Sequence, residues 1–66
     1  MSENHELDKP ILFEIDQAAE YLNVSVRMIR RMVEEKRVAY IKIGKLIRID
    51  KRDIDAYLAA QRIEAL

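Results

Sequence analysis

The sequence predicts a mainly α fold with one small β-hairpin, in the order helix, turn, helix, hairpin, helix. Two stretches carry apolar residues at helical spacing and are separated by about three residues. A third stretch alternates apolar and polar residues on both sides of a glycine, as the arms of a hairpin do. The chain has 66 residues, which is enough for a single domain with a thin core.

The first helix is expected over residues 15–22. Its apolar residues follow the i, i+3, i+4, i+7 spacing of one helix face: Ile15, Ala18, Ala19 and Leu22. Asn23 tolerates left-handed backbone geometry and is expected to end this helix. Residues 1–10 are expected to form a mobile tail, and residues 11–13 a short apolar segment with at least one buried side chain.

The second helix is expected over residues 26–36, with Ser25 as its N-cap. Its core side carries Val26, Ile29, Met32 and Val33. The other side carries three arginines within about 100° of arc, together with Met28: Arg27, Arg30 and Arg31. Two short amphipathic helices joined by a tight turn form a helix-turn-helix motif.

The hairpin is expected from arms at residues 39–43 and 46–49. Gly44 and Lys45 lie between the arms, and a two-residue turn with glycine first suits type II′. Four isoleucines are expected to point inward from the two arms: Ile41, Ile43, Ile47 and Ile49. Three basic residues are expected on the outer face or at the tip: Lys42, Lys45 and Arg48.

The last helix is expected over residues 51–63, capped by Asp50. Its core stripe is expected to contain Ile54, Tyr57, Leu58 and Ala65. A second stripe, of Ala56, Ala59, Ile63 and Leu66, is either a contact surface for a partner or a frayed helix end. The complete arrangement expected over residues 11–66 is a winged helix-turn-helix.

Charge is unevenly distributed along a chain whose net charge is zero. Residues 27–52 contain ten basic and three acidic side chains, a net charge of +7. The flanking segments are acidic, with net charges of −5 over residues 1–26 and −2 over residues 53–66. Because a phosphate backbone responds to the local field, this basic block favours nucleic acid as a partner, although charge runs are also common on solvated surfaces.

Several function classes lack the residues they need. The chain has no cysteine, its one histidine is His5, and its serines are Ser2 and Ser25, so we expect neither an enzyme nor a metal site. There is no glycine-rich phosphate loop, and we expect no cofactor and no small-molecule substrate. No apolar run approaches the length that spans a bilayer, so we expect a cytoplasmic protein without a membrane partner.

Three segments carry a family resemblance through their order and spacing: FEIDQAAEYLNVS at residues 13–25, IKIGKLIRI at 41–49 and DIDAYL at 53–58. Together they resemble the excisionase-type DNA-binding domains, relatives of the MerR-like winged helices, over about residues 12–59. The resemblance implies a recognition helix in the major groove and a wing along the minor groove or backbone. Arg31 matches a basic position typical of that family, whereas Lys36 stands where the family often has glycine.

By position, the resemblance assigns double-stranded DNA contacts to Arg27, Met28, Arg30 and Arg31 of the recognition helix and to Lys42, Lys45 and Arg48 of the wing. The free N–H groups beside Ser25 are expected to donate hydrogen bonds to a phosphate. The resemblance implies an excisionase, or recombination directionality factor, of a phage or mobile element, with an integrase or further copies of itself as partners. A small transcription regulator and a protein-binding winged helix are the alternatives.

Overall fold

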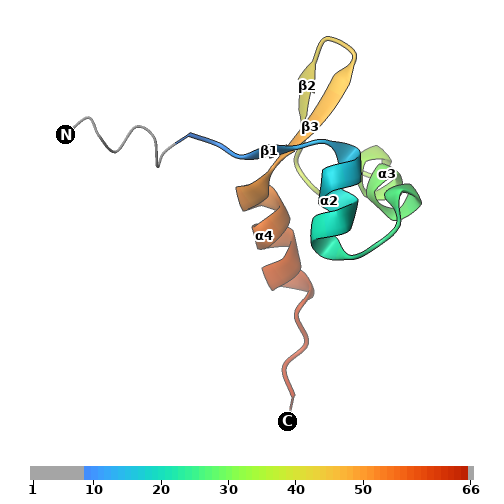
Figure 1. The fold of residues 1–66 in the computed structure, drawn as a ribbon. Helices are drawn as coiled ribbons and strands as arrows, with labels where there is room; N and C mark the ends of the chain where they lie inside the picture. The colour runs from blue at the N-terminus through green and yellow to red at the C-terminus, as the bar shows by residue number, and fades with distance from the viewer. Residues whose placement is uncertain (1–8, 66) are drawn as a thin grey trace, which may run out of the picture.

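The computed structural model describes residues 9–65 (Figure 1). The elements are β1 (Leu12–Phe13), α2 (Ile15–Leu22), α3 (Val26–Glu34), β2 (Ile41–Ile43), β3 (Leu46–Asp50) and α4 (Lys51–Gln61). The three strands form an antiparallel sheet in the order β1-β3-β2. This is the predicted winged helix-turn-helix, and most of the tail predicted over residues 1–10 lies outside the described residues.

Strand β1 was not predicted from the sequence. It pairs with β3 through Leu12 opposite Asp50 and Phe13 opposite Ile49. The backbone N–H of Lys51 donates to the carbonyl of Ile11 at 2.8 Å and continues this contact into α4. Two paired residues give too short a pattern to distinguish a strand from a loop by alternation.

Helix α2 has the predicted bounds. At its start, the backbone N–H of Glu14 donates to Oε1 of Gln17 at 2.8 Å. At its end, Asn23 has a φ of 58°, and the N–H of Val24 donates to the carbonyl of Ala19 at 2.9 Å. The turn to α3 is short because Ser25 already caps the next helix, its Oγ accepting from the N–H of Met28 at 3.1 Å.

Helix α3 ends at Glu34, two residues before the predicted end. The reason is Lys36, which has a left-handed φ of 58°. The N–H of Arg37 donates to the carbonyl of Met32 at 2.9 Å, and that of Lys36 to the carbonyl of Val33 at 3.1 Å. This pair of bonds is a Schellman motif, which satisfies the last carbonyls of a helix and turns the chain away from it.

The core contains one fully buried isoleucine from each of α3, β3 and α4: Ile29, Ile49 and Ile54. Ala18 and Ala19 of α2 are also buried, and their small side chains let α2 pack closely on its neighbours. The core therefore fixes the orientation of α3 and the base of the β2–β3 hairpin relative to each other.

The hairpin turn is as predicted, and Ile47 and Ile49 of β3 face the core as predicted, but the inward face predicted for Ile41 and Ile43 of β2 is wrong. Gly44 has a φ of 61° and Lys45 is not among the residues with positive φ, as a type II′ turn requires. The register pairs Ile41 with Arg48, Lys42 with Ile47, and Ile43 with Leu46. Paired residues share a face, so Ile41 and Ile43 lie with Leu46 and Arg48 and are exposed.

The other hairpin face carries Lys42, Ile47 and Ile49, of which only Ile49 is fully buried. Lys42 and Arg48 were expected together on an outer face, and the register instead places them on opposite faces. Only the base of the hairpin reaches the core, and its tip projects from the body (Figure 1).

Helix α4 begins at Lys51 as predicted, and Asp50 caps it. It ends at Gln61, two residues before the predicted end, so Ile63 and Ala65 lie beyond it. Ile54 and Tyr57 pack on the core as predicted, whereas Leu58 is 46% exposed and does not belong to the core stripe. The hypothetical second stripe therefore does not form as a helix face, and its last member, Leu66, lies outside the described residues.

Candidate nucleic-acid interface

Helix α3 separates its apolar and basic residues onto two sides. Ile29, Met32 and Val33 are buried. The opposite side exposes the three arginines and Met28: Arg27, Met28, Arg30 and Arg31. The structure therefore presents these four predicted recognition residues to solvent on one side of a helix that the core holds in place.

The N-terminal part of this exposed side is hollowed. A shallow depression of about 350 Å³ is lined by Ser25, Arg27, Met28 and Arg31. It lies at the start of α3, where backbone N–H groups have no carbonyl partner in the preceding turn. The depression combines two guanidinium groups with a helix N-terminus, and both favour an anion.

A second depression joins α3 to the hairpin. It has a volume of about 310 Å³, and its cationic side chains are Arg30 of α3 with Lys45 and Arg48 of the hairpin. The rest of its lining is Glu14, Ile15, Asp16, Leu46 and Ile47. Basic residues that are far apart in the sequence therefore meet at one surface.

The basic residues of the block differ in whether they already have acidic partners. Four of the ten in residues 27–52 form ion pairs: Arg37 with Glu35, Arg48 with Glu14, Lys51 with Asp55, and Arg52 with Asp50. The other six form no ion pair within residues 9–65: Arg27, Arg30, Arg31, Lys36, Lys42 and Lys45. The cations that remain unpaired are concentrated on α3 and the hairpin.

Arg48 is more constrained than the other predicted wing residues. Its side chain is only 25% exposed, and Nη1 donates to the carbonyl of Ile47 at 2.9 Å. Nη2 lies 4.0 Å from Oε2 of Glu14. Arg48 therefore supports the base of the hairpin, whereas Lys45 at the tip is exposed and has no ion pair in the described part of the chain.

Lys42 lines neither of these two depressions, and it lies on the hairpin face opposite Arg48. Of the eight predicted site residues, the structure thus gathers four at the N-terminal part of α3 and three at the junction of α3 with the hairpin. Lys42 lies apart from both groups.

Sequence reasoning missed two features of this surface. Glu14 and Asp16, at the start of α2, bring negative charge into the second depression. Ile43 and Leu46 form an exposed apolar pair at the hairpin tip. The signal for this pair was the loop length, because a two-residue turn fixes which residues pair across a hairpin.

At the C-terminal end of the basic block, the carboxylates of Asp50 and Asp55 form ion pairs with its last two cations, Arg52 and Lys51. The hydrogen bond from the Arg52 side chain lowers the pKa of Asp50. Nζ of Lys51 donates to Oδ2 of Asp55 at 2.8 Å, and this bond raises the pKa of Lys51 and lowers that of Asp55. The hydroxyl of Tyr21 donates to Oδ1 of Asp55 at 2.7 Å, which ties α2 to α4.

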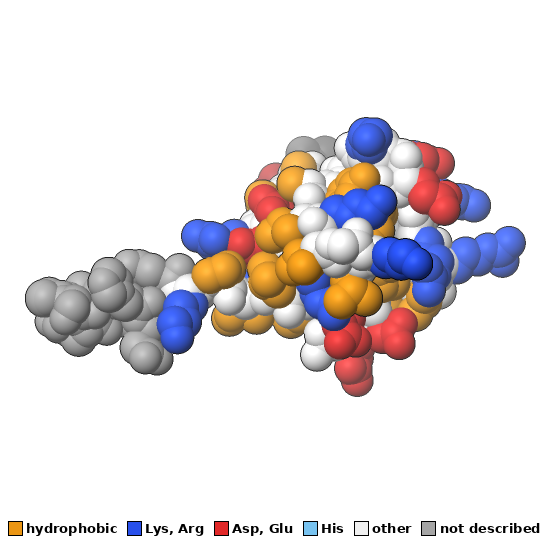
Figure 2. Space-filling model, turned by 90° about the horizontal axis from the view of Figure 1, so that it is seen from above, with side chains coloured by type: hydrophobic (Ala, Val, Ile, Leu, Met, Phe, Trp, Pro, Cys, Tyr) orange, Lys and Arg blue, Asp and Glu red, His pale blue; other side chains and the backbone are white. Residues whose placement is uncertain are grey.

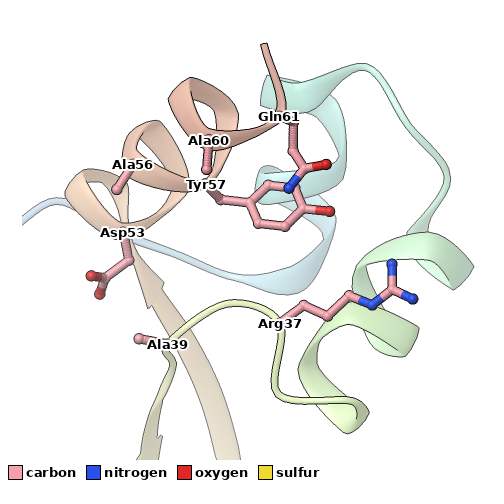
Figure 3. Close-up of a pocket in the computed structure, with 7 residues that line it drawn as sticks. All are labelled: Arg37, Ala39, Asp53, Ala56, Tyr57, Ala60 and Gln61. Carbon is pink, nitrogen blue, oxygen red and sulfur yellow. The ribbon is translucent and has the colours of Figure 1, made fainter. Parts of the chain in front are cut away.

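A third and larger depression, of about 600 Å³, lies between α4 and the segment before β2 (Figure 3). Asp53 and Arg37 lie at opposite ends of it in Figure 3, and its middle is lined by Ala56, Tyr57 and Ala60. Its one cation, Arg37, pairs with Glu35 at 2.9 Å. Size alone therefore does not mark the candidate interface, because four of the six cations without an ion pair in residues 9–65 line the two smaller depressions.

Two consecutive helices with a tight turn, followed by a basic hairpin packed against the second, define a winged helix-turn-helix domain. Domains of this class are non-enzymatic and bind DNA through the second helix. The family model described as a helix-turn-helix domain matches residues 12–62, so the chain belongs to that family. No curated protein and no solved structure gave a significant match to the chain.

The family match covers the segment over which the chain resembles excisionase-type domains, and it assigns the broader helix-turn-helix family. Within the described residues, no helix is both long and apolar enough to cross a membrane.

Proposed function

We propose that this chain binds double-stranded DNA sequence-specifically, with α3 in the major groove and the β2–β3 hairpin along the adjacent minor groove or backbone. The observation that carries the proposal is the depression in which Arg30 of α3 meets Lys45 of the hairpin. Both side chains are exposed, and neither has an acidic partner among the described residues. Two elements can therefore engage one duplex together.

The α3 residues have distinct roles in this proposal. Arginine pairs bidentately with O6 and N7 of guanine, so Arg27, Arg30 and Arg31 supply base contacts or clamp phosphates. Met28, exposed between them, makes an apolar contact with a thymine methyl group. The N-terminus of α3 beside Ser25 binds a backbone phosphate.

The hairpin residues position the domain and carry less sequence information. Lys45 enters the minor groove, whose negative potential attracts cations. Lys42 contacts phosphate from the opposite hairpin face, and Arg48 keeps the base of the hairpin against Glu14. The DNA-binding unit in this proposal is residues 11–66.

The biological role we propose is that of an excisionase, or recombination directionality factor, of a phage or mobile element, acting in the cytoplasm. The resemblance of residues 13–25, 41–49 and 53–58 to excisionase-type, MerR-like domains supports it. A single module of this size buries about 600–1,000 Å² on DNA, so stable binding calls for an integrase or further copies on adjacent sites. A small transcription regulator would use the same surface.

The test begins with selection of bound sequences from a random DNA pool, followed by affinity measurements on the best site. Arg31→Ala is expected to weaken binding to that site by about 1–3 kcal/mol and to relax its base preference at one position. Arg62→Ala is the matched control, because it removes the same charge from an exposed arginine beyond α4 that pairs with Glu64.

Equal affinity of the wild type and Arg31→Ala for the selected site would reject the assigned recognition face. An excision reaction reconstituted with the cognate integrase then separates the two roles. Stimulation of excision by the chain supports the role of directionality factor. Repression of a promoter, with no stimulation of excision, supports the role of transcription regulator.

A further inference from the structure

The tip of the hairpin is apolar as well as basic. Ile43 and Leu46 flank the Gly44-Lys45 turn and pair directly across it, so their side chains lie on the same face. They are 52% and 53% exposed, and neither packs on the core. Ile41 extends the same face toward the base of the hairpin and is 39% exposed.

This apolar strip needs an explanation beyond folding. The core is already closed at the base of the hairpin by Ile49, with Ile47 packed against it. Scattered exposed apolar residues are ordinary, but three on one face of a projecting hairpin form a contiguous patch. Such a patch indicates a contact that the isolated chain does not make.

The charges around the strip indicate what covers it. Lys45 lies between Ile43 and Leu46 in the turn and has no ion pair among the described residues. In Figure 2, which looks down on the projecting end of the hairpin, hydrophobic side chains lie among several lysine and arginine side chains. An apolar surface beside Lys45 and Arg30, neither of which has an ion pair among the described residues, matches a polyanion that also offers apolar base faces.

The strip is also continuous with the proposed DNA surface. Leu46 lines the depression that contains Arg30 of α3, together with Lys45. A duplex that engages Arg30 and Lys45 therefore passes directly over Leu46. In the proposed binding mode, the tip of the hairpin reaches the minor groove of this duplex.

We propose that Ile43 and Leu46 form a wedge that enters the minor groove, presses against one base step and bends the duplex. This inference rests on the proposed DNA binding and adds a mechanical role to the hairpin. Apolar side chains inserted at a base step partly unstack it and kink DNA toward the major groove by about 20–90°. Pyrimidine–purine steps are the most easily kinked, so the wedge selects such a step under the hairpin without a hydrogen bond to it.

The test uses the double variant Ile43→Thr/Leu46→Thr in the full chain. Threonine has a high preference for strands, and neither position contributes to the core, so the fold is expected to persist. Leu58→Ala is the matched control, an exposed leucine on α4. Circular dichroism and thermal melting establish that each variant is folded before DNA is added.

Two readouts on a duplex selected from a random pool report the wedge. Energy transfer between dyes at the duplex ends reports the bend, and 2-aminopurine placed at successive steps reports unstacking. The wild type and Leu58→Ala are expected to bend the duplex and to brighten 2-aminopurine at one step. The double variant is expected to lose most of both signals while keeping the same salt slope of binding, because its cations are unchanged.

The outcomes separate the two proposals. Salt-dependent binding to straight DNA by the wild type, or an equal bend by the double variant, overturns the wedge and leaves DNA binding intact. Absence of salt-dependent DNA binding by the wild type overturns the proposed function, and the wedge with it. A wild-type dimer in sedimentation that the double variant loses, with no difference in DNA bend, assigns the strip to a second copy of the chain and also overturns the wedge.

Discussion

Asp50 stabilises the junction between β3 and α4 through several contacts. Its Oδ1 accepts from the backbone N–H of Arg52 at 2.8 Å and caps the helix, and Oδ2 accepts from Nη2 of Arg52 at 2.8 Å. Its backbone lies opposite Leu12 of β1. The carboxylate is largely buried, and the Arg52 side chain, followed by the Arg52 backbone N–H, lowers its pKa.

Replacing Asp50 with asparagine keeps an oxygen that can cap α4 and removes the charge that Arg52 binds. Because the pKa of Asp50 in the folded chain lies below its ordinary value of 3.8, ionisation stabilises the fold. This stabilisation is fully present above that ordinary value and is lost as the pH falls through the folded-state pKa. Thermal melting is therefore expected to show Asp50→Asn less stable than the wild type at neutral pH, with the difference disappearing in strong acid.

Asp53→Asn is the control for this experiment, since it removes a carboxylate from the first turn of the same helix. A pH-dependent loss of the same size in Asp53→Asn would assign the effect to the helix dipole. The ion pair with Arg52 would then not be its source.

At the scale of elements, α2 and α3 end in the same backbone conformation, although different residues adopt it. Asn23 and Lys36 both have a φ of 58°, and each lies at the same position of a Schellman motif. Asparagine visits the left-handed region readily, whereas a lysine there is strained by its Cβ. The end of α3 therefore carries a cost that the end of α2 largely avoids.

Lys36→Gly is expected to stabilise the domain. Relief of the left-handed strain contributes about 1–2 kcal/mol, and the greater freedom of glycine in the unfolded chain removes about 0.5–1 kcal/mol. The net gain of about 0.5–1 kcal/mol corresponds to a rise in melting temperature of about 2–8 °C for a domain of this size. Asn23→Gly, measured in parallel, is expected to change the melting temperature much less.

The elements that could be predicted from the sequence are those set by local patterns. The start of α3 follows from the Ser25 cap, and the bounds of α2 follow from its apolar stripe and Asn23. The early end of α3 was not predictable in this way, because lysine is not a residue that usually adopts left-handed geometry. Helix bounds were therefore most accurate where the side chain itself favours the backbone conformation.

The hairpin shows what a local pattern leaves open. Alternation placed isoleucines at odd-numbered positions of both arms and suggested a single inward face. Across a two-residue turn, however, odd positions of one arm pair with even positions of the other, as Ile43 does with Leu46. The exposed apolar strip and the separation of Lys42 from Arg48 both follow from this register, which only pairing of the two arms reveals.

At the scale of the whole molecule, the fold sorts a neutral chain into regions of different charge. Four cations of the basic block form internal ion pairs: Arg37, Arg48, Lys51 and Arg52. Those of the block that form none with the described residues lie on α3, at its end and on the hairpin. The candidate site could be predicted as a set of basic residues from their positions in the sequence. Which of them already have acidic partners depended on tertiary contacts such as that of Glu14 with Arg48.

This sorting predicts the salt dependence of DNA binding. Five cations on the exposed side of α3 and on the hairpin form no ion pair with any residue from 9 to 65: Arg27, Arg30, Arg31, Lys42 and Lys45. If each neutralises one phosphate, the logarithm of the association constant falls with the logarithm of salt concentration with a slope of about −4.5. Lys45→Ala is expected to reduce the steepness of this slope by about 1 and to weaken binding to all sequences about equally.

Arg37→Ala removes the same charge from the same basic block, but Arg37 pairs with Glu35 and lies in the depression beside α4. Its salt slope is expected to match that of the wild type, because an ion-paired side chain away from the duplex releases no counterion on binding. Fluorescence anisotropy titrations of the three proteins at several salt concentrations measure these slopes. If Lys45→Ala and Arg37→Ala reduced the steepness of the salt slope equally, binding would depend on total charge. It would then not depend on the surface formed by α3 and the hairpin.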